Sequence, residues 1–210
     1  MSDEVARLRI AELAREWSTP VSADQVEGIR AFLALLLRWN KSVNLTGART
    51  ADDLVDEHLP DSFALARLAP AASSVVDVGA GGGLPGVPFA LLRPDCSVTL
   101  VEPRAKRTAF LSTARREVAP SLVVVRARVE EIGAGKFDVA ASRATFSPSE
   151  WLIAARRLLA TGGRAVVFSA EAGSCGAEGY ALEDASSYKT RRGAPRWAGA
   201  YVPRGTPASR

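Results

Sequence analysis

Five glycines crowd the segment that follows one short apolar stretch, in the sequence VVDVGAGGGLPG at residues 75–86. Glycine permits backbone angles and a closeness of approach that any Cβ atom would prevent, and so many glycines weaken an ordered segment unless something compensates. We therefore predict that a ligand lies on this backbone, against the alternative of a glycine-rich turn without one. Pro85 suits the first turn of a helix, so the amides at residues 84–86 are expected to bind a negative group of the ligand.

Two spacings of glycine compete within this segment. Gly81, Gly83 and Gly86 satisfy the pattern of dinucleotide-binding loops, so a nicotinamide or flavin cofactor is one possibility at this point. Gly79, Gly81 and Gly83 instead match the spacing usual for S-adenosylmethionine sites. Asp77 stands two residues before the first of these glycines, within reach of the ammonium group of that cofactor. The second interpretation explains more of the residues.

Glu102 stands at the end of the next predicted strand. A carboxylate in this place can accept hydrogen bonds from both ribose hydroxyls of a bound nucleoside, and both classes of cofactor predict it. Its alternative role is to cap the helix that begins at Arg104.

The elements that must position these residues alternate between strand and helix after residue 70, which is the signature of a parallel sheet covered by helices. The predicted strands are residues 75–78, 97–102, 122–126, 137–141 and 164–169, and the predicted helices are residues 85–92, 104–117 and 149–159. Right-handed crossovers make the sheet doubly wound, with its ligand at the carboxyl ends of the strands. Two further strand-like stretches, SSYKT and RWAGAYV, are expected to form a closing hairpin.

Apolar residues recur at helical spacing in the part of the chain before the sheet. Helices are predicted at residues 5–17, at residues 22–39 and from residue 50 onward. Ser22 and Gln25 have the spacing of a capping box at the start of the second helix. Pro60 is expected to kink or split the third helix.

Length and composition favour a globular protein with an extension. The 210 residues are 47% hydrophobic and 24% charged, which argues against disordered and fibrous classes. We expect a helical extension at residues 1–70 and a Rossmann-like α/β domain at residues 71–210 with a basic C-terminal segment. No apolar run approaches the roughly 18 residues of a membrane span, and the first residues lack the features of a secretion signal. A cytoplasmic protein without membrane contact is therefore predicted.

Cysteine and histidine are too rare and too scattered for a metal site. Cys96 and Cys175 are the only cysteines, and His58 is the only histidine. No pair of cysteines has the spacing of a zinc or redox motif, so we predict that no metal is bound.

The distribution of charge says more about partners than its total. A net charge of +4 favours a polyanionic partner only mildly. However, residues 104–116 carry five basic residues and no acid, and every charged residue from 189 to 210 is basic. Solvated helix faces and a loose tail are the alternative interpretation.

Several stretches of the chain together resemble the RsmG (GidB) family, bacterial methyltransferases that modify a guanine N7 of 16S ribosomal RNA. The matching text is LLLRWNKSVNLTGART with EHLPDSFAL, DVGAGGGLPGVPFALLRPD, VTLVEPRAKRTAFL, and RARVEE with FDVAASRA, which spans residues 35–145. The resemblance implies a Rossmann-like class I methyltransferase fold, S-adenosylmethionine as the cofactor and 16S ribosomal RNA or the small ribosomal subunit as the partner. We expect the protein to act as a monomer.

The resemblance also implies roles for single residues. Gly79 and Leu84 would border the methionine part of the cofactor. Val129 and Glu130 would hold its adenine, and Glu102 its ribose. Alternatively, Glu130 is an acidic residue in a loop that is exposed to solvent and binds no cofactor.

Arg143 would stand at the mouth of the active site, where it would contact the cofactor and orient the guanine or its phosphate as the one catalytic candidate. Alternatively, Arg143 forms an ion pair at the surface. Lys106 and Arg107 are expected to steer the RNA backbone, and Lys41 either contacts RNA or ends a helix. We expect His58 to serve in packing or capping. No general acid or base is expected, because guanine N7 carries an exposed lone pair that is unprotonated at neutral pH.

The resemblance weakens after the fifth predicted strand. The family usually shows a lysine and a glycine there, whereas this chain has Ser169, Ala170 and Glu171. The basic C-terminal segment is the candidate to replace that RNA contact. Three alternatives stay open: a methyltransferase acting on another RNA, a small molecule or a protein; an NAD(P)-dependent oxidoreductase; and a non-catalytic RNA-binding module.

Overall fold

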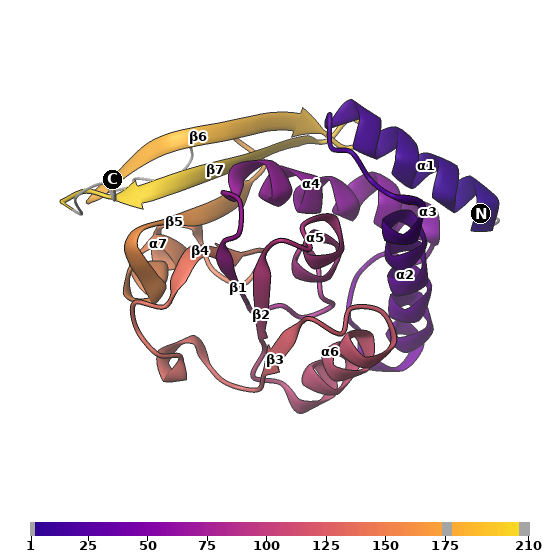
Figure 1. Cartoon of the computed structure of the whole chain (residues 1–210), viewed down its shortest axis with the longest axis horizontal. Helices are drawn as coiled ribbons and strands as arrows, with labels where there is room; N and C mark the ends of the chain where they lie inside the picture. The colour runs from indigo at the N-terminus through magenta and orange to yellow at the C-terminus, as the bar shows by residue number, and fades with distance from the viewer. Residues whose placement is uncertain (1–2, 174–177, 206–210) are drawn as a thin grey trace.

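The computed structural model describes residues 3–173 and 178–205, whose strands form one seven-stranded sheet in the order β3-β2-β1-β4-β5-β7-β6 (Figure 1). The strands are β1 Ser74–Val78, β2 Ser97–Val101, β3 Val123–Val125, β4 Phe137–Ser142, β5 Leu159–Ser169, β6 Tyr180–Lys189 and β7 Pro195–Pro203. The first five strands pair in parallel, and β7 is antiparallel to both of its neighbours. The predicted doubly wound, mostly parallel sheet and its closing hairpin are confirmed.

Helices cover both faces of this sheet. They are α1 Asp3–Glu16, α2 Ala23–Val43, α3 Ala51–Asp53, the π-helix η1 Leu54–His58, α4 Leu59–Leu68, α5 Gly86–Leu92, α6 Ala105–Glu117, the 3-10 helix η2 Val129–Glu131 and α7 Pro148–Leu158. Helices α4, α5 and α6 pack on one face together with α2, and α7 packs on β4 and β5 from the other. In Figure 1, the β6–β7 hairpin runs over α4 and its tip reaches α1.

Local sequence signals explain where the N-terminal helices begin and end. Ser22 and Gln25 form the predicted capping box at the start of α2, which satisfies backbone amides that have no partner within the helix. Asn44 ends α2 in the left-handed conformation, with φ 50°. Pro60 stands in the first turn of α4, directly after the π-helix η1, so the predicted split of the third helix is confirmed.

The fifth strand differs from its prediction. It begins at Leu159 and not at residue 164, because Leu159 already pairs with Phe137 and the ladder then continues past an irregularity. The sequence predicted Leu159 as the last residue of the helix at residues 149–159 and assigned no element to residues 160–163. The second cysteine, Cys175, lies outside the described residues.

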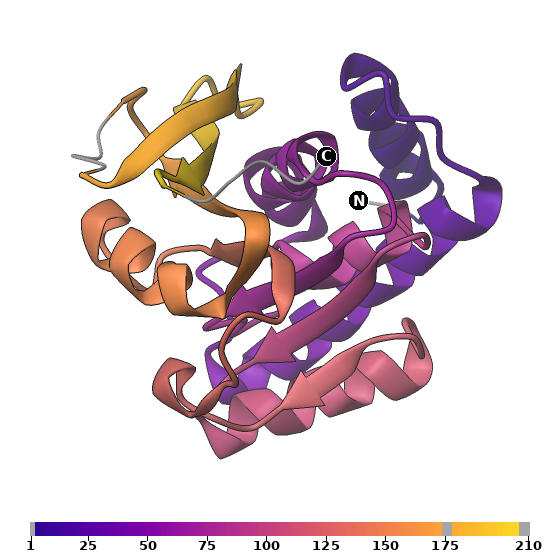
Figure 2. The ribbon, with the colours of Figure 1, turned by 60° about the vertical axis from the view of Figure 1, so that its left-hand side comes forward.

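The N-terminal helices share one hydrophobic core with the sheet. Phe32 and Leu36 of α2 belong to the same buried cluster as Val75 of β1 and Leu100 of β2. In Figure 2, the hairpin and the edge strand β3 lie at opposite ends of the sheet. The division into an extension at residues 1–70 and a domain at residues 71–210 stays a prediction.

Candidate active site

The loop after β1 holds its glycines in conformations that side chains rarely adopt. Gly79 has φ 73° and Gly81 has φ 52°, both in the left-handed region. A Cβ atom on Gly79 would lie 2.3 Å from Oγ1 of Thr145, whereas one on Gly81 would lie no closer than 3.5 Å to any atom outside its neighbours. The bare backbone that the sequence predicts is therefore present at the carboxyl end of β1, and Gly79 is its most crowded point.

Asp77 lies beneath this loop and is buried. Its Oδ2 atom accepts a hydrogen bond of 3.0 Å from the amide of Gly86, the first residue of α5. Burial raises the pKa of Asp77 to about 7, although the Gly86 amide and the charge of Arg143 act in the opposite direction. The predicted anion site at residues 84–86 is corrected here, because Asp77 supplies the negative group that the Gly86 amide binds. A contact between Asp77 and the cofactor stays a prediction.

Glu102 joins the end of β2 to the same loop. The residue is buried, and its Oε2 atom accepts a hydrogen bond of 3.0 Å from the amide of Gly81. Its Oε1 atom accepts one of 2.9 Å from the amide of Arg104, as the capping alternative expects. A carboxylate oxygen has two lone pairs, so both oxygens keep acceptor capacity for a further donor.

A cleft of about 460 Å³ opens beside these residues. Gly79 lies in its wall together with Val129 and Glu130, and Thr145 and Phe146 complete it. Arg157 fixes η2 by donating hydrogen bonds of 2.6 Å to the carbonyl of Val129 and 2.7 Å to that of Ile132. The predicted residues Gly79, Val129 and Glu130 thus meet in one cleft at the carboxyl ends of β1 and β2.

Leu84 and Gly83 lie behind this cleft and do not line it. Leu84 belongs to the buried core cluster, with an exposed fraction of 8%. A Cβ atom on Gly83, whose φ is 77°, would lie 2.8 Å from Cγ2 of Val87. The predicted contact of Leu84 with the cofactor stays a prediction.

Arg143 follows β4 and reaches a second cavity, of about 260 Å³. Its Nη1 atom lies 2.6 Å from Oδ2 of Asp61, and its Nη2 atom lies 2.8 Å from Nδ1 of His58. The Arg143 side chain is only 20% exposed, so the alternative of a surface ion pair fits poorly. Burial and then the charge of Arg143 lower the pKa of His58 to about 4, so the ring is neutral at neutral pH.

The second cavity adjoins the cleft through one short segment. Arg143 and Ala144 line the cavity, and the next residue, Thr145, lines the cleft. Ala144 has φ 56°, an uncommon conformation for a residue with a side chain. Ser169, Ala170 and Arg196 complete the cavity, so β7 contributes a cation to it.

Sequence reasoning missed several residues of this site. Asp61 and Tyr188 contact each other and complete the surroundings of Arg143, and Thr145 and Phe146 form a wall of the cleft. The sequence contains one sign of Asp61, since it is the one acidic residue of the largely apolar helix α4. No pattern in the sequence indicated a role for Tyr188, because that role depends on the path of the hairpin.

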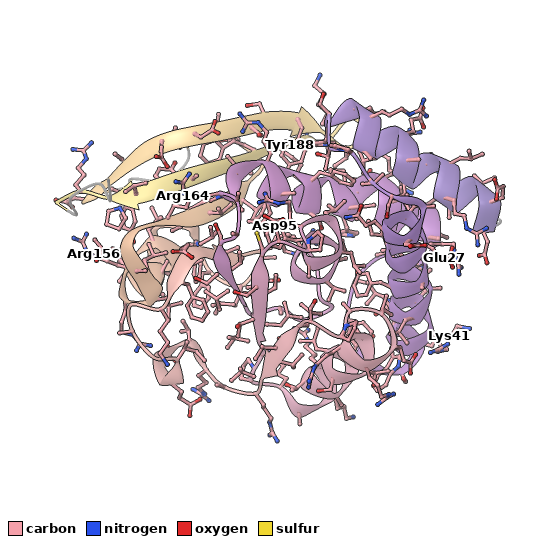
Figure 3. The ribbon with its side chains drawn as sticks, viewed as in Figure 1. Glu27, Lys41, Asp95, Arg156, Arg164 and Tyr188 are labelled. Carbon is pink, nitrogen blue, oxygen red and sulfur yellow. The ribbon has the colours of Figure 1, made fainter. Side chains whose placement is uncertain are left out.

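The predicted RNA-contacting residues do not form one group. Arg107 lies over the glycine loop, with its Nη1 atom 3.5 Å from the place a Cβ atom of Gly81 would take, and Lys106 is exposed beside it. Within the described part of the chain, neither has a carboxylate within 4.0 Å. Lys41 lies on α2, beside a separate depression lined by α1 and α2, and extends from the edge of the molecule (Figure 3).

Two cations of the basic C-terminal segment form ion pairs with the N-terminal helices. Arg191 pairs with Glu12, and its guanidinium nitrogens also lie 3.7 Å from Glu16 and 3.8 Å from Asp56. Arg192 pairs with Asp53. These two cations hold the tip of the hairpin against α1, α3 and η1. That the basic segment replaces an RNA contact stays a prediction. The last basic residue, at position 210, lies outside the described residues.

The described residues contain neither a cluster of metal ligands nor a membrane-spanning helix. Between residues 3 and 205, with 174–177 left aside, no three His, Cys, Asp or Glu side chains gather where they could hold a metal ion. Over the same residues, no helix is both long enough and apolar enough to cross a membrane. The absence of a bound metal stays a prediction.

Comparisons with known proteins agree with this geometry. Residues 25–178 match the family described as GidB, rRNA small subunit methyltransferase G. The ribosomal RNA small subunit methyltransferase G of Leptothrix cholodnii is 41% identical over 156 residues, which cover 71% of this chain and 72% of the relative. The protein of the same name from Halorhodospira halophila is 38% identical over 164 residues, which cover 78% of this chain and 76% of that relative.

The fold is also found among solved structures. A predicted O-methyltransferase from Agrobacterium tumefaciens superimposes with a TM-score of 0.56 at 18% identity, over 70% of this chain and 82% of that one. The similarity of this chain to that structure confirms the predicted methyltransferase fold. The family match covers the chain from α2 to β5, and the chain belongs to the rRNA small subunit methyltransferase G family.

Proposed function

We propose that this protein transfers a methyl group from S-adenosylmethionine to N7 of a guanine in 16S ribosomal RNA. The observation that carries the proposal is that consecutive residues line two cavities, with Arg143 and Ala144 in one and Thr145 in the other. The cleft lined by Gly79, Val129 and Glu130 suits a nucleoside cofactor, and the cavity that contains Arg143 suits the base that receives the methyl group. Family membership supports the same reaction.

The residues around the cleft fit the proposed cofactor. A Cβ atom on Gly81 would lie no closer than 3.5 Å to any atom outside its neighbours, so the loop leaves space there, and the carboxylate of Glu102 keeps lone pairs that can accept from ribose hydroxyls. Val129 and Glu130 would hold the adenine, and the glycine loop with Leu84 and Arg143 would border the methionine part. Asp77 supports this loop from below through Gly86. When bound, S-adenosylmethionine supplies an electrophilic methyl group on a sulfonium centre.

Positioning is the main catalytic contribution that we assign to the protein. Guanine N7 is a nucleophile without prior deprotonation, so the site needs no general base, and His58 with its lowered pKa of about 4 is not placed in that role. Holding reacting groups in line can lower a barrier by about 7 to 11 kcal/mol in well-oriented systems. Arg143 would orient the guanine or its phosphate from the rim of the cavity.

The RNA would approach the face that carries α6 and the cleft. N7 of guanine is inaccessible in the deep, narrow major groove of an RNA helix, so we propose that the target base comes from a loop or junction. Lys106 and Arg107, which have no acidic partner in the described structure, would contact phosphates, with Lys41 as a more distant contact. We further propose that the protein acts in the cytoplasm, since ribosomal RNA is its substrate, and that it acts as a monomer.

Calorimetry and a transfer assay test the proposal. The purified protein should bind S-adenosylmethionine and not NAD, and it should transfer labelled methyl groups to small-subunit RNA. Gly81→Val should abolish cofactor binding, because the new side chain would need a disfavoured φ and would fill the loop. Binding of NAD in place of S-adenosylmethionine would contradict the proposal.

A further inference from the structure

We infer that Asp61 is a positioning residue for Arg143, and that Tyr188 of the C-terminal hairpin fixes Asp61 in that role. The inference rests on the proposed function, because it takes Arg143 as the residue that orients the reacting groups. It adds to that function a buried link between the catalytic candidate, the N-terminal helices and the hairpin.

The carboxylate of Asp61 is engaged on both of its oxygens. Oδ2 lies 2.6 Å from Nη1 of Arg143, and Oδ1 accepts a hydrogen bond of 2.6 Å from the hydroxyl of Tyr188. The Asp61 side chain is only 5% exposed, so water competes little for either oxygen. A buried carboxylate held from both sides has one available orientation, and it transmits that orientation to the guanidinium.

His58 fixes the other side of the guanidinium. Its Nδ1 atom lies 2.8 Å from Nη2 of Arg143, and its backbone carbonyl lies 3.4 Å from Nη1. Because the ring is neutral, Nδ1 can accept this hydrogen bond when the ring proton is on Nε2. Asp61 and His58 therefore hold both terminal nitrogens of Arg143. Its planar group then faces the cavity in one pose, whereas a free arginine side chain samples many.

Tyr188 brings distant parts of the chain into this arrangement. Its ring packs edge-on against Trp17 at the end of α1, with ring centroids 5.0 Å apart. Figure 3 shows Tyr188 at the junction of the hairpin with α1. The pair Arg67 and Asp184 joins the same two elements, α4 and β6, at 3.0 Å and does not contact Arg143. That second pair provides a matched control.

A double-mutant cycle tests the inference in the full-length protein. Asp61→Asn should slow methyl transfer at saturating cofactor and RNA by about tenfold or more, since the partner of a buried charge is lost. Arg143→Ala combined with Asp61→Asn should be no slower than Arg143→Ala alone, within about twofold, because Asp61 acts only through Arg143. Tyr188→Phe should give a smaller loss in the same direction, and Asp184→Asn should leave transfer unchanged. Losses that multiply in the double variant would overturn the inference.

A spectroscopic measurement separates this inference from the proposed function. In protein labelled with 15N-arginine, the side-chain N–H signals of Arg143, assigned by their loss in Arg143→Ala, should be protected from solvent exchange. That protection should disappear in Asp61→Asn and persist in Asp184→Asn. Protection that survives Asp61→Asn refutes the positioning role whether or not the wild type transfers methyl groups. An inactive wild type with the expected loss of protection would refute the proposed function and leave the structural link in place.

Discussion

The carboxylate of Asp77 accepts a hydrogen bond from the amide of Gly86, nine residues later and across the whole glycine loop. The two residues are so close that a Cβ atom on Gly86 would lie 2.6 Å from Oδ2 of Asp77. The strand that precedes the loop and the helix that follows it are thus tied together below the cleft. This tie explains why the loop can be rich in glycine and still hold one shape.

Asp77 should make the stability of the protein depend on pH near neutrality. Its folded pKa is raised to about 7 from an ordinary value of 3.8, so the native state binds more protons than the unfolded state between those values. The stabilising contribution of the protonated group is complete below pH 4 and is lost as the pH rises towards 7. In Asp77→Asn this loss is absent, because the amide does not ionise.

Chemical unfolding of wild type and Asp77→Asn without cofactor, at intervals between pH 4 and 8, measures this effect. The free energy of unfolding of the variant relative to wild type should rise by a few kcal/mol across the window and level off above it, since one pKa unit corresponds to about 1.4 kcal/mol. A difference that is constant from pH 4 to 8 is incompatible with a raised pKa.

His58 should titrate far below the usual range for histidine. Burial and the charge of Arg143 lower its pKa to about 4, and the chain has no other histidine, so its NMR signals are unambiguous in untagged protein. Arg143→Ala should raise this pKa but leave it below 6.5, because the burial remains. A wild-type titration near 6.5 would contradict a buried His58 ring beside Arg143. Stability linked to His58 should be complete above pH 6.5 and fall towards pH 4.

Gly79 should be essential for cofactor binding because of crowding, and not only because of its backbone angle. Gly79→Ala places a methyl group against Thr145, whereas Gly135→Ala, at φ 65°, has open space around it. Gly135→Ala should lower the free energy of unfolding by about 1 kcal/mol, the cost of a side chain in the left-handed region, and Gly79→Ala should lower it by more because of the overlap with Thr145. Only Gly79→Ala should weaken binding of S-adenosylmethionine, by tenfold or more on the scale of about 1.4 kcal/mol per factor of ten. Equal calorimetric affinities for the two variants would place the cofactor elsewhere.

Arg107 and Arg191 should differ in what they do for RNA binding, although both belong to strongly basic segments. Arg107 has no described acidic partner, whereas Arg191 contacts acids on α1 and η1. Arg107→Gln should reduce the slope of log affinity against log salt by about 1, as expected for one lost phosphate contact. Arg191→Gln should leave that slope unchanged and instead lower stability by about 1 kcal/mol or less, because its ion pairs are partly exposed. The reverse pattern, measured by filter binding and thermal unfolding, would restore the RNA role of the C-terminal segment.

The sequence predicted the features of this fold that depend on neighbours along the chain. The capping box of Ser22 with Gln25, the split at Pro60 and the bare loop from Gly79 are each set by residues a few positions apart. The start of β5 was missed because Leu159 belongs to the sheet through its pairing with Phe137, and no local pattern records that pairing.

The surroundings of Arg143 could not be predicted for the same reason. Asp61 and Arg143 are 82 residues apart, and Tyr188 is 127 residues from Asp61. Only the folded sheet brings these side chains into one buried group. The charge pattern was likewise ambiguous, since a cation that contacts RNA and one that pairs with an acid from α1 look alike in sequence.

The most direct test of the proposed reaction is to locate the transferred methyl group. Small-subunit RNA from a strain that lacks this protein should be incubated with the purified protein and labelled S-adenosylmethionine, then digested and analysed by mass spectrometry. We predict one new 7-methylguanosine in 16S ribosomal RNA, which is lost with Gly79→Ala and retained with Gly135→Ala. A methyl group on another atom or another RNA, or no transfer by a protein that is folded and binds the cofactor, would contradict the proposed function.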